Sequence, residues 1–386
     1  MEFRDLKQQY RVLQQQMDKA ILDAVASGAY IMGKPVKELE AQLAEYVGVK
    51  HCLSCANGTD ALTLALKAWG IGPGDAVFVP DFTFFSSAEV VPLEGATPVF
   101  VDVCEDTFNI DATDLQRAVE QVLAEGRLKP RVVVAVDLFG LPADYPAIRA
   151  VADKYGLLIL EDGAQGFGGS IVMADSDQPS RACSFGDIAT TSFFPAKPVG
   201  CYGDGGAVFT DNDEWAALIE SYRVHGKGEF KYDNVRIGMN SRLDTVQAAV
   251  LQVKLKAFAE YELDAVNKAA ALYSERLKGL ATPVVPEGFR SSWAQYTIRF
   301  SDSAERDKVQ AFLKASGIPS MVYYPKPMHL QTAFQAEYTL SFRAESRNLC
   351  PVATSLCERV LSLPMHPYIT DEEINTVCNA VKAALK

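Results

Sequence analysis

Between residues 50 and 210 the chain alternates short apolar runs with segments of helical periodicity, and this alternation limits the possible folds more than any other feature. Several runs, such as AVFVP and RVVVAVDL, are almost continuously apolar, which is typical of strands buried on both faces of a parallel sheet. Between residues 61 and 69, apolar residues recur at the i, i+3, i+4 and i+7 positions of a helix. Repetition of strand and helix predicts an α/β domain with a mostly parallel sheet and helices on both faces. The candidate strands are 51–54, 76–80, 97–102, 131–138, 157–162, 189–194 and 205–210.

The pattern changes after about residue 250. A helical stretch from Asp244 to Leu277 is followed by the break TPVVPEGFRSS, a strand-like run at 293–300, a helix at 304–316 and a last helix that begins near Thr370. A chain of 386 residues is longer than one compact core usually holds. We therefore expect a large α/β domain over 1–250, which includes the N-terminal helix, and a smaller C-terminal α+β domain over 251–386.

Charge and hydropathy argue against several classes of protein. The formal net charge is −12, whereas proteins that bind nucleic acid usually carry a basic surplus. The N-terminal segment MEFRDLKQQYRVLQQQ is polar, and no run reaches the roughly 18 apolar residues that a membrane span requires. We expect a cytoplasmic protein that binds neither nucleic acid nor membrane. Cys52 and Cys55 form a CxxC without a second pair at usable spacing, so we expect reduced thiols and no metal site.

Polar residues collect directly after the predicted strands, where open α/β sheets bind their ligands. Asp162 ends the run LLILED, and Gln165 follows it. Lys197 lies in TSFFPAKPVGCYGDGGAVFT, just past a later strand and before a Gly-rich turn. A carboxylate at the end of a buried strand needs a cationic partner or caps a helix. An aspartate and a lysine around one crevice also fit pyridoxal 5′-phosphate (PLP), which needs an amine to bind its aldehyde carbon and an acid to keep its ring nitrogen protonated.

The stretch CANGTDALTLAL offers a place for the phosphate of this cofactor. Gly58 allows close approach of the backbone, Thr59 adds a hydroxyl group, and the helix that begins there directs its positive end toward an anion. A plain turn explains the same residues, since no Walker or dinucleotide fingerprint surrounds them. An aromatic ring to stack on the cofactor is also expected. The segment DFTFFSS contains Phe82, Phe84 and Phe85, and composition does not choose among them.

The motifs EDGAQ, TSFFPAKPVGCYGDGGA and GMNSRLDTVQAA resemble those of the DegT/DnrJ/EryC1/StrS family of PLP-dependent sugar aminotransferases. The resemblance extends from GAYIMGKPVKELE to LSLPMHPY and covers most of the chain. It implies fold-type I, that of aspartate aminotransferase, with a mostly parallel seven-stranded sheet, and a homodimer with shared active sites. Within the family the chain is most similar to enzymes that aminate C3 of a UDP-linked 3-keto-N-acetylhexosaminuronate, for the biosynthesis of amino sugars and surface polysaccharides such as the lipopolysaccharide O-antigen.

The resemblance also implies a role for each residue of the motifs. Lys197 binds the cofactor covalently, Asp162 pairs with its ring nitrogen, and Gln165 bonds its ring hydroxyl. The residues implied at the remaining parts of the cofactor are Gly58, Thr59 and Ser192 at the phosphate, Phe84 against the ring, and Asn240 at the phosphate of the neighbouring subunit's cofactor.

Glutamate is the expected amino donor and a keto-sugar nucleotide the expected acceptor. Arg242 is the best candidate to bind an acidic group of either, although an ion pair with Asp244 explains it nearly as well. His225 lies in a predicted loop, where it could touch substrate or the neighbouring subunit. The uronate-type enzymes carry a His-Tyr pair before a proline, where this chain has Tyr323 and Tyr324. Tyr323 can donate a hydrogen bond but cannot carry a positive charge.

Three other functions would place different requirements on the residues of the site. Within the family, the acceptor could instead be a dTDP- or UDP-linked keto-6-deoxyhexose, aminated at C3 or C4. A PLP-dependent sugar dehydrase is disfavoured, because the known dehydrases of the family replace the lysine that is present here as Lys197. A PLP-binding regulatory protein without turnover is disfavoured as well, since binding alone does not require that lysine.

Overall fold

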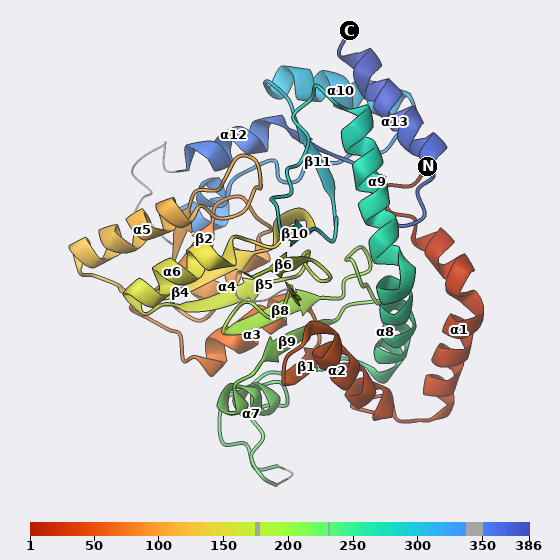
Figure 1. Ribbon diagram of the computed structural model, residues 1–386. Helices are drawn as coiled ribbons and strands as arrows, with labels where there is room; N and C mark the ends of the chain where they lie inside the picture. Colours follow the sequence, from red (N-terminus) through yellow and green to blue (C-terminus); the bar gives the residue numbers. More distant parts are fainter. Residues whose placement is uncertain (174–177, 231, 337–349) are drawn as a thin grey trace.

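The computed structural model describes residues 1–173, 178–230, 232–336 and 350–386. Its centre is a seven-stranded sheet in the order β1-β9-β8-β5-β4-β2-β3 (Figure 1). Strand β9 runs antiparallel to both of its neighbours, and the other pairs are parallel. The seven predicted strands and the mostly parallel sheet are therefore confirmed. The strands are β1 (His51–Cys55), β2 (Asp75–Pro80), β3 (Thr97–Val101), β4 (Lys129–Val136), β5 (Leu158–Asp162), β8 (Ile188–Ser192) and β9 (Gly206–Thr210).

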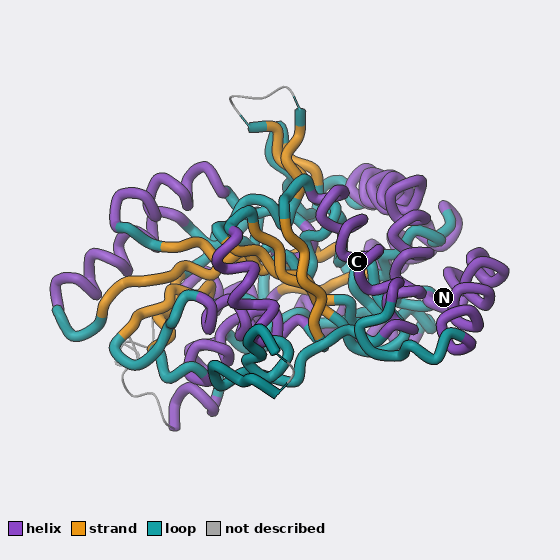
Figure 2. The backbone as a smooth tube through the Cα atoms, turned by 90° about the horizontal axis from the view of Figure 1, so that it is seen from below, coloured by secondary structure: helices purple, strands orange, loops and turns teal. Residues whose placement is uncertain are grey.

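Helices cover both faces of this sheet (Figure 2). Successive strand residues point to opposite faces, so Val77 of β2 packs with one group of helices and Phe78 with the other. One face is covered by α3 (Gly58–Ala68), α4 (Ser86–Leu93) and α7 (Asp213–Tyr222), and the other by α5 (Ala112–Glu125) and α6 (Tyr145–Tyr155). All residues of β2 and β3 are buried, which explains why their sequences lack alternation.

The remaining helices surround the ends of the sheet. The predicted helical stretch 244–277 forms as α8 (Thr245–Ala257) and α9 (Leu263–Arg276), joined through one π-helical turn, Phe258–Glu262. Helix α1 (Leu6–Ala26) packs on α8, and so does α2 (Lys34–Val47). A capping box between Thr370 and Glu373 begins the last helix, α13 (Asp371–Ala384). None of the helices in the described parts of the chain is long and apolar enough to cross a membrane.

Two small sheets complete the fold. Strand β11 (Tyr296–Arg299) pairs antiparallel with β12 (Val360–Leu363) beside α10 (Ser303–Ala315). The other small sheet has the order β10-β6-β7. Its strands are β10 (Phe289–Arg290), β6 (Ser170–Val172) and β7 (Pro179–Arg181), and the short helical segments elsewhere are η1 (Leu138–Gly140), η3 (Met328–Leu330), α11 (Thr332–Ala336) and α12 (Pro351–Arg359).

One large apolar cluster joins residues of α2, α8, β11 and α13. The expected domain boundary at residue 250 falls within α8, and the division into two domains stays a proposal. Cys52 and Cys55 are buried in β1, where burial raises the pKa of Cys55 to about 12 and that of Cys52 well above its usual range. Both thiols are therefore protonated packing groups at neutral pH.

Candidate active site

A cavity of about 550 Å³ lies at the carboxyl ends of β5 and β8. Its walls come from the start of α3, the segment after β2, the turn after β5, the turn after β8, and the pair Tyr323 and Tyr324. The cavity therefore occupies the edge of the sheet where open α/β folds bind ligands. Polar residues that are far apart in the sequence meet there, including Asp162, Gln165 and Lys197.

Lys197 projects from a tight turn that follows β8. Within this turn the Lys197 backbone N–H donates to the Phe194 carbonyl at 2.8 Å, and the Cys201 N–H donates to the Phe193 carbonyl at 2.7 Å. Gly200 is required by close approach, because a Cβ there would clash with the Pro195 carbonyl oxygen. Burial lowers the pKa of the Lys197 amine, and the charge of Arg4 lowers it further, whereas Asp162 opposes the shift. A larger fraction of this amine is thus neutral at a given pH than for a solvated lysine.

Asp162 is the last residue of β5 and is buried. Its Oδ2 accepts a hydrogen bond from the Ser87 hydroxyl at 2.7 Å, and its Oδ1 accepts from the Ala164 backbone N–H at 3.2 Å. Thr83 lies within hydrogen-bonding distance of Ser87, with 3.1 Å between the two hydroxyl oxygens. These bonds fix the plane of the carboxylate, and each oxygen can accept a further bond from a cationic group in the cavity.

Gln165 is held from both ends of its amide group. Its Oε1 accepts from the backbone N–H of Phe139 at 2.6 Å, and its Nε2 donates to the Tyr324 hydroxyl at 3.0 Å. Since Oε1 is bonded to an N–H group, the amide orientation is fixed, and the second hydrogen on Nε2 is left for another acceptor. The turn between Asp162 and Gln165 therefore presents one fixed acid and one fixed donor to the cavity.

The N-terminus of α3 provides a place for an anion. Asn57 caps this helix, and its side chain accepts from the Asp60 backbone N–H at 2.8 Å. Gly58 lies against Ser192 at the end of β8, because a Cβ on Gly58 would stand 2.8 Å from the Ser192 Cβ. Thr59 shares a hydrogen bond of 2.8 Å with Ser86. Free backbone N–H groups, the helix dipole and hydroxyl groups thus converge at one end of the cavity.

Aromatic side chains form another wall. Phe84 lines the cavity and remains 52% exposed, whereas Phe82 is fully buried against Phe108 and Phe139. The structure therefore separates two of the three phenylalanines that composition left equivalent, and Phe84 is the ring available to a ligand. Tyr324 lies 6.2 Å from Phe84 between ring centroids, and Tyr323 packs next to Tyr324.

Three predicted site residues do not line the cavity of their own chain. His225, Asn240 and Arg242 belong to the α7–α8 loop (residues 223–244, with residue 231 outside the described parts), which extends away from the body of the molecule in Figure 1. Arg242 donates to the Asn240 side-chain oxygen at 2.5 Å, and Asp244 is the N-cap residue of α8. The alternative of an Arg242–Asp244 ion pair is wrong, because the described residues Arg242 and Asp244 do not form one.

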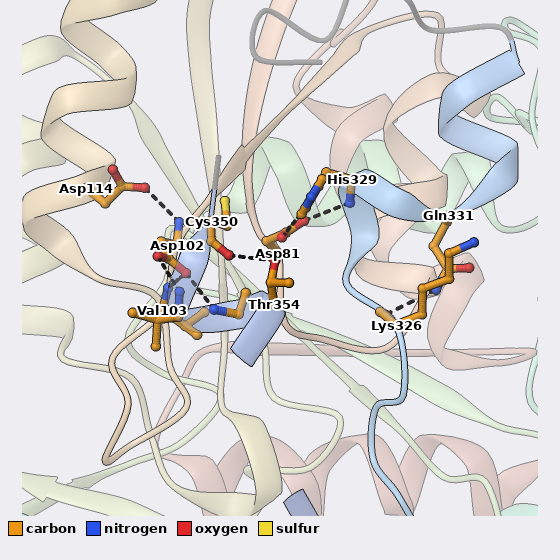
Figure 3. Close-up of polar contacts among 11 residues, drawn as sticks. Asp81, Asp102, Val103, Asp114, Lys326, His329, Gln331, Cys350 and Thr354 are labelled. Carbon is orange, nitrogen blue, oxygen red and sulfur yellow. Dashed lines mark hydrogen bonds and ion pairs between the residues drawn. The ribbon is translucent and has the colours of Figure 1, made fainter. Parts of the chain in front are cut away.

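Two buried aspartates attach C-terminal segments to the sheet beside the site (Figure 3). Asp81, directly after β2, accepts from the His329 backbone N–H at 2.7 Å and contacts the His329 ring nitrogen Nδ1 at 2.5 Å. Asp102, directly after β3, accepts from the first backbone N–H groups of α12, those of Val352 and Ala353, at 3.0 and 2.8 Å. The first contact fixes the segment that carries Tyr323 and Tyr324.

Sequence reasoning missed several residues of the cavity wall. Ser87, Glu89, Asp204 and Gln295 line it, and Arg4 binds the turn that carries Lys197. Glu89 accepts from Ser86 at 3.2 Å and places a carboxylate on the α4 side. Only the motif around Lys197 contained a hint, because Asp204 lies in its Gly-rich part. The others lack a local signal, since it is the fold that brings them to the cavity.

The residues of the cavity fit PLP in its charged groups and in its shape. The α3 N-terminus with Gly58 and Ser192 forms a cradle for a phosphate, into which a Cβ at residue 58 would intrude. Asp162 offers an oriented carboxylate for a protonated ring nitrogen, and Phe84 offers an exposed face for stacking. Lys197 offers the amine that binds the aldehyde carbon of this cofactor.

Residues 12–382 match the model of the DegT/DnrJ/EryC1/StrS aminotransferase family. The chain is 43% identical over 383 residues to the UDP-2-acetamido-2-deoxy-3-oxo-D-glucuronate aminotransferase of Pseudomonas aeruginosa, with 99% of both chains covered. It is 38% identical to the UDP-N-acetyl-3-dehydro-α-D-glucosamine 3-aminotransferase of Acidithiobacillus ferrooxidans, over 99% of this chain and 97% of that protein.

Solved structures agree with these matches. An aminotransferase of this family from Brucella abortus superimposes with a TM-score of 0.93 at 47% identity and covers 99% of both chains. NtdA of Bacillus subtilis, solved with bound pyridoxamine phosphate, superimposes with a TM-score of 0.84 at 26% identity, over 97% of this chain and 82% of that one. The fold, the cavity and the similarity over nearly the whole length place the chain in the DegT/DnrJ/EryC1/StrS family of PLP-dependent aminotransferases.

Proposed function

We propose that the protein moves an amino group from glutamate to C3 of a UDP-linked 3-keto-N-acetylhexosaminuronate, with PLP as cofactor. The observation that carries this proposal is the convergence of Lys197, Asp162 and Gln165 on one cavity whose other end is the α3 N-terminus. The relative from Pseudomonas aeruginosa, which is named for the 3-oxo-glucuronate, supports the choice of sugar.

Bound PLP would carry the amino group between the two substrates and accept the electron pair of the carbon that loses its proton. Lys197 would hold the cofactor through its Nζ atom, and the same atom could take up and return the proton of the donor Cα. Burial lowers the pKa of this amine, and a lower pKa favours the neutral form that a base requires. Asp162 holds a positive charge at the ring nitrogen, and Ser87 holds Asp162.

The other groups of the cavity bind and orient. Gly58, Thr59 and Ser192 hold the phosphate at the α3 N-terminus, and Phe84 stacks on the ring. One hydrogen of the Gln165 amide group is bonded to the Tyr324 hydroxyl, and the other would be donated to the ring hydroxyl of PLP. Tyr323 and Tyr324 line the same cavity, where their hydroxyl groups can bind oxygen atoms of the sugar or the donor.

A second acceptor is favoured by the charge of the cavity wall. Its lining includes the carboxylates of Glu89 and Asp204, and Lys197 is its one cationic side chain among the described residues. A sugar without a carboxylate at C6 avoids repulsion by these acids. The relative from Acidithiobacillus ferrooxidans, named for UDP-N-acetyl-3-dehydroglucosamine, makes the neutral sugar the second candidate.

A homodimer would supply the charge that a uronate needs. The α7–α8 loop carries Tyr232 and Ile237, which are 86% and 91% exposed, and isolated domains seldom expose several large apolar side chains on one segment. If this loop crosses to a second copy, Arg242 can bind the sugar carboxylate in the neighbouring cavity, and Asn240 and His225 can approach the phosphate and the substrate there.

The test uses the visible absorbance of the purified protein with PLP. Glutamate should bleach the band of the bound cofactor, and the correct keto sugar should restore it. Each 3-keto sugar, the uronate and the neutral form, is added to the bleached protein, with a 4-keto-6-deoxyhexose nucleotide as the comparison. Faster recovery with the uronate than with the neutral sugar supports the first candidate, and the reverse order supports the second. A protein that acquires no band with PLP would contradict both.

A further inference from the structure

We propose that Arg4 is a positioning residue for the Lys197 amine, because it binds the backbone of the turn that carries this lysine. The inference rests on the proposed function, in which Lys197 is the amine that binds the cofactor. It assigns to the first residues of the chain a part in the active site that their sequence does not indicate.

The contact is a direct one. The Nη2 atom of Arg4 donates to the backbone carbonyl oxygen of Lys197 at 2.7 Å and lies 3.4 Å from that of Pro198. No sequence-local interaction explains this bond, since 193 residues separate the two partners. The carbonyl groups that Arg4 binds belong to the same tight turn that is closed by the Lys197 N–H bond to Phe194. Arg4 therefore completes the hydrogen bonding of the turn.

The N-terminal segment is itself fixed on both sides of Arg4. The Phe3 carbonyl accepts from the Met365 backbone N–H at 3.1 Å, and the Phe3 ring packs edge-on against Tyr323 with 6.2 Å between centroids. Asp5 caps α1 by accepting from the Gln8 backbone N–H at 2.8 Å. Figure 1 shows the start of the chain beside α13. Both sequence neighbours of Arg4 are therefore anchored.

The charges around Arg4 act on Lys197 and on one another. Burial lowers the pKa of Arg4 to about 10, with Glu262 opposing, so the guanidinium is charged at neutral pH. Its charge also lowers the pKa of Lys254 and of His366, in both cases in addition to burial. Glu262 in turn accepts hydrogen bonds from the side chains of Gln9 and Tyr368. Asp162 raises the pKa of the Lys197 amine, whereas Arg4 lowers it.

A guanidinium suits this place for two reasons. Its Nη2 group carries two hydrogens at the end of a long side chain, so one nitrogen approaches two carbonyl oxygens of the same turn. Its charge favours the neutral form of a nearby amine. Loss of Arg4 should therefore misplace the Lys197 side chain and also leave a smaller fraction of it neutral at pH 7.

The experiment compares full-length protein, freed of cofactor, in four forms: wild type, Arg4→Met, Arg4→Lys and Arg11→Met. Arg11 is an exposed arginine of α1 and serves as the matched control. PLP is added at a series of pH values, the Lys197 amine adds to its aldehyde carbon with loss of water, and borohydride then delivers a hydride to that carbon. The resulting secondary amine at Lys197 is quantified by peptide mass spectrometry, without reference to turnover.

Arg4→Met should label Lys197 about tenfold more slowly at pH 7, with the midpoint of the rate against pH moved upward. Arg4→Lys should keep the midpoint and recover part of the rate, and Arg11→Met should match wild type. In turnover, Arg4→Met should lower kcat with little change in KM for glutamate.

Equal labelling of Arg4→Met and wild type at every pH would overturn the proposal, and so would an Arg4→Lys protein no better than Arg4→Met. If circular dichroism shows that Arg4→Met is unfolded, the labelling rate of Arg4→Lys relative to wild type tests the proposal by itself. Slower labelling with an unchanged midpoint supports the proposal, and labelling at the wild-type rate contradicts it. A wild-type protein that PLP does not label at Lys197 would contradict the proposed function instead.

Discussion

At the scale of single residues, the chemistry of Lys197 depends on groups that come from three distant parts of the chain. The lysine is half-buried beside Asp162, which favours its charged form, and near Arg4, which favours its neutral form. Asp162 is in turn oriented by Ser87. Burial is the main cause of the lowered pKa of this amine, so a larger fraction of it is neutral than for a lysine in solution.

Removal of the amine tests its role directly. We expect Lys197→Ala to lower turnover by at least about 10³-fold, because both the covalent bond to PLP and the proton transfer depend on Nζ. Circular dichroism should be unchanged, since the side chain faces a cavity. Lys256→Ala, at an exposed position of α8, is the control and should keep wild-type activity. Full activity of Lys197→Ala would rule out the proposed mechanism.

The Ser87 hydroxyl should matter through Asp162. A hydrogen bond to a charged group contributes about 1.5–3 kcal/mol, so Ser87→Ala should weaken the binding of PLP by about tenfold or more as the carboxylate loses its orientation. Ser87→Thr retains a hydroxyl group and should bind PLP nearly as well as wild type. Fluorescence titration of the cofactor-free protein measures both. If the alanine and threonine variants bind equally, the bond to Asp162 does not orient the site.

A buried pair of acids below the Asp162–Gln165 turn predicts a pH dependence of stability. Burial raises the pKa of Glu161 to about 7 and that of Asp137 well above its usual range, and the charge of Glu161 raises the pKa of Asp137 further. The folded state therefore keeps a proton that the unfolded state loses above about pH 4.5. The stability contributed by the pair is present at low pH and is lost as the pH rises through about 7.

Asp137→Asn should reduce this loss. An asparagine can still accept from Tyr145 and from the Ala143 backbone N–H, as Asp137 does, and it adds no charge next to Glu161. The Tm of the variant minus that of wild type should therefore increase between pH 5 and pH 8, by about 2–4 °C for each kcal/mol of relieved repulsion. Asp153→Asn, exposed on α6, is the control. If the Tm values of Asp137→Asn and wild type change with pH in the same way, the acid pair does not keep a proton in the folded state.

At the scale of secondary-structure elements, the site depends on how closely the start of α3 approaches the end of β8. Gly58 permits this approach, and the phosphate cradle that we propose consists of the helix N-terminus and Ser192 together. We expect Gly58→Ala to weaken the binding of PLP by at least about tenfold, since the added Cβ must move α3 away from Ser192 and an anion at a helix N-terminus is stabilised only at close range.

Gly72→Ala is a matched control for this prediction, because a Cβ there meets only the Glu94 carbonyl oxygen, at 3.7 Å. Equilibrium binding of PLP to both variants, with Tm values to verify folding, makes the comparison. If Gly58→Ala binds PLP as tightly as Gly72→Ala, the close approach of the two elements is not what holds the phosphate.

At the scale of the whole molecule, three predicted site residues lie on a loop that does not reach the cavity of its own chain. A homodimer with exchanged loops explains their position, and a mixing experiment tests it. Lys197→Ala and Asn240→Ala proteins should each be nearly inactive. After joint refolding or subunit exchange, half of the dimers are mixed, and each mixed dimer has one intact site.

The mixture should therefore recover about one quarter of the wild-type activity, because half of the dimers carry half of their sites. Co-purification with two different affinity tags isolates the mixed dimers and should raise the recovery to about one half. A mixture that stays inactive, although the tags show that mixed dimers have formed, would place Asn240 in the site of its own chain.

Much of this protein follows from its sequence alone. The seven strands could be predicted because residues buried on both faces of a parallel sheet must be apolar. Each strand is therefore visible in the sequence as a short apolar run. Asp162, Gln165 and Lys197 could be predicted because strand ends and a Gly-rich turn mark one edge of the sheet.

Tertiary structure decided the rest. Phe84 was separated from Phe82 by burial, which depends on the packing of Phe108 and Phe139 and not on the local sequence. The contact between Arg4 and the Lys197 turn joins residues 193 positions apart, and no pattern of neighbouring residues encodes it. Local sequence dictates periodicity and burial of an element, whereas the partners of a polar group are fixed only when distant elements pack together.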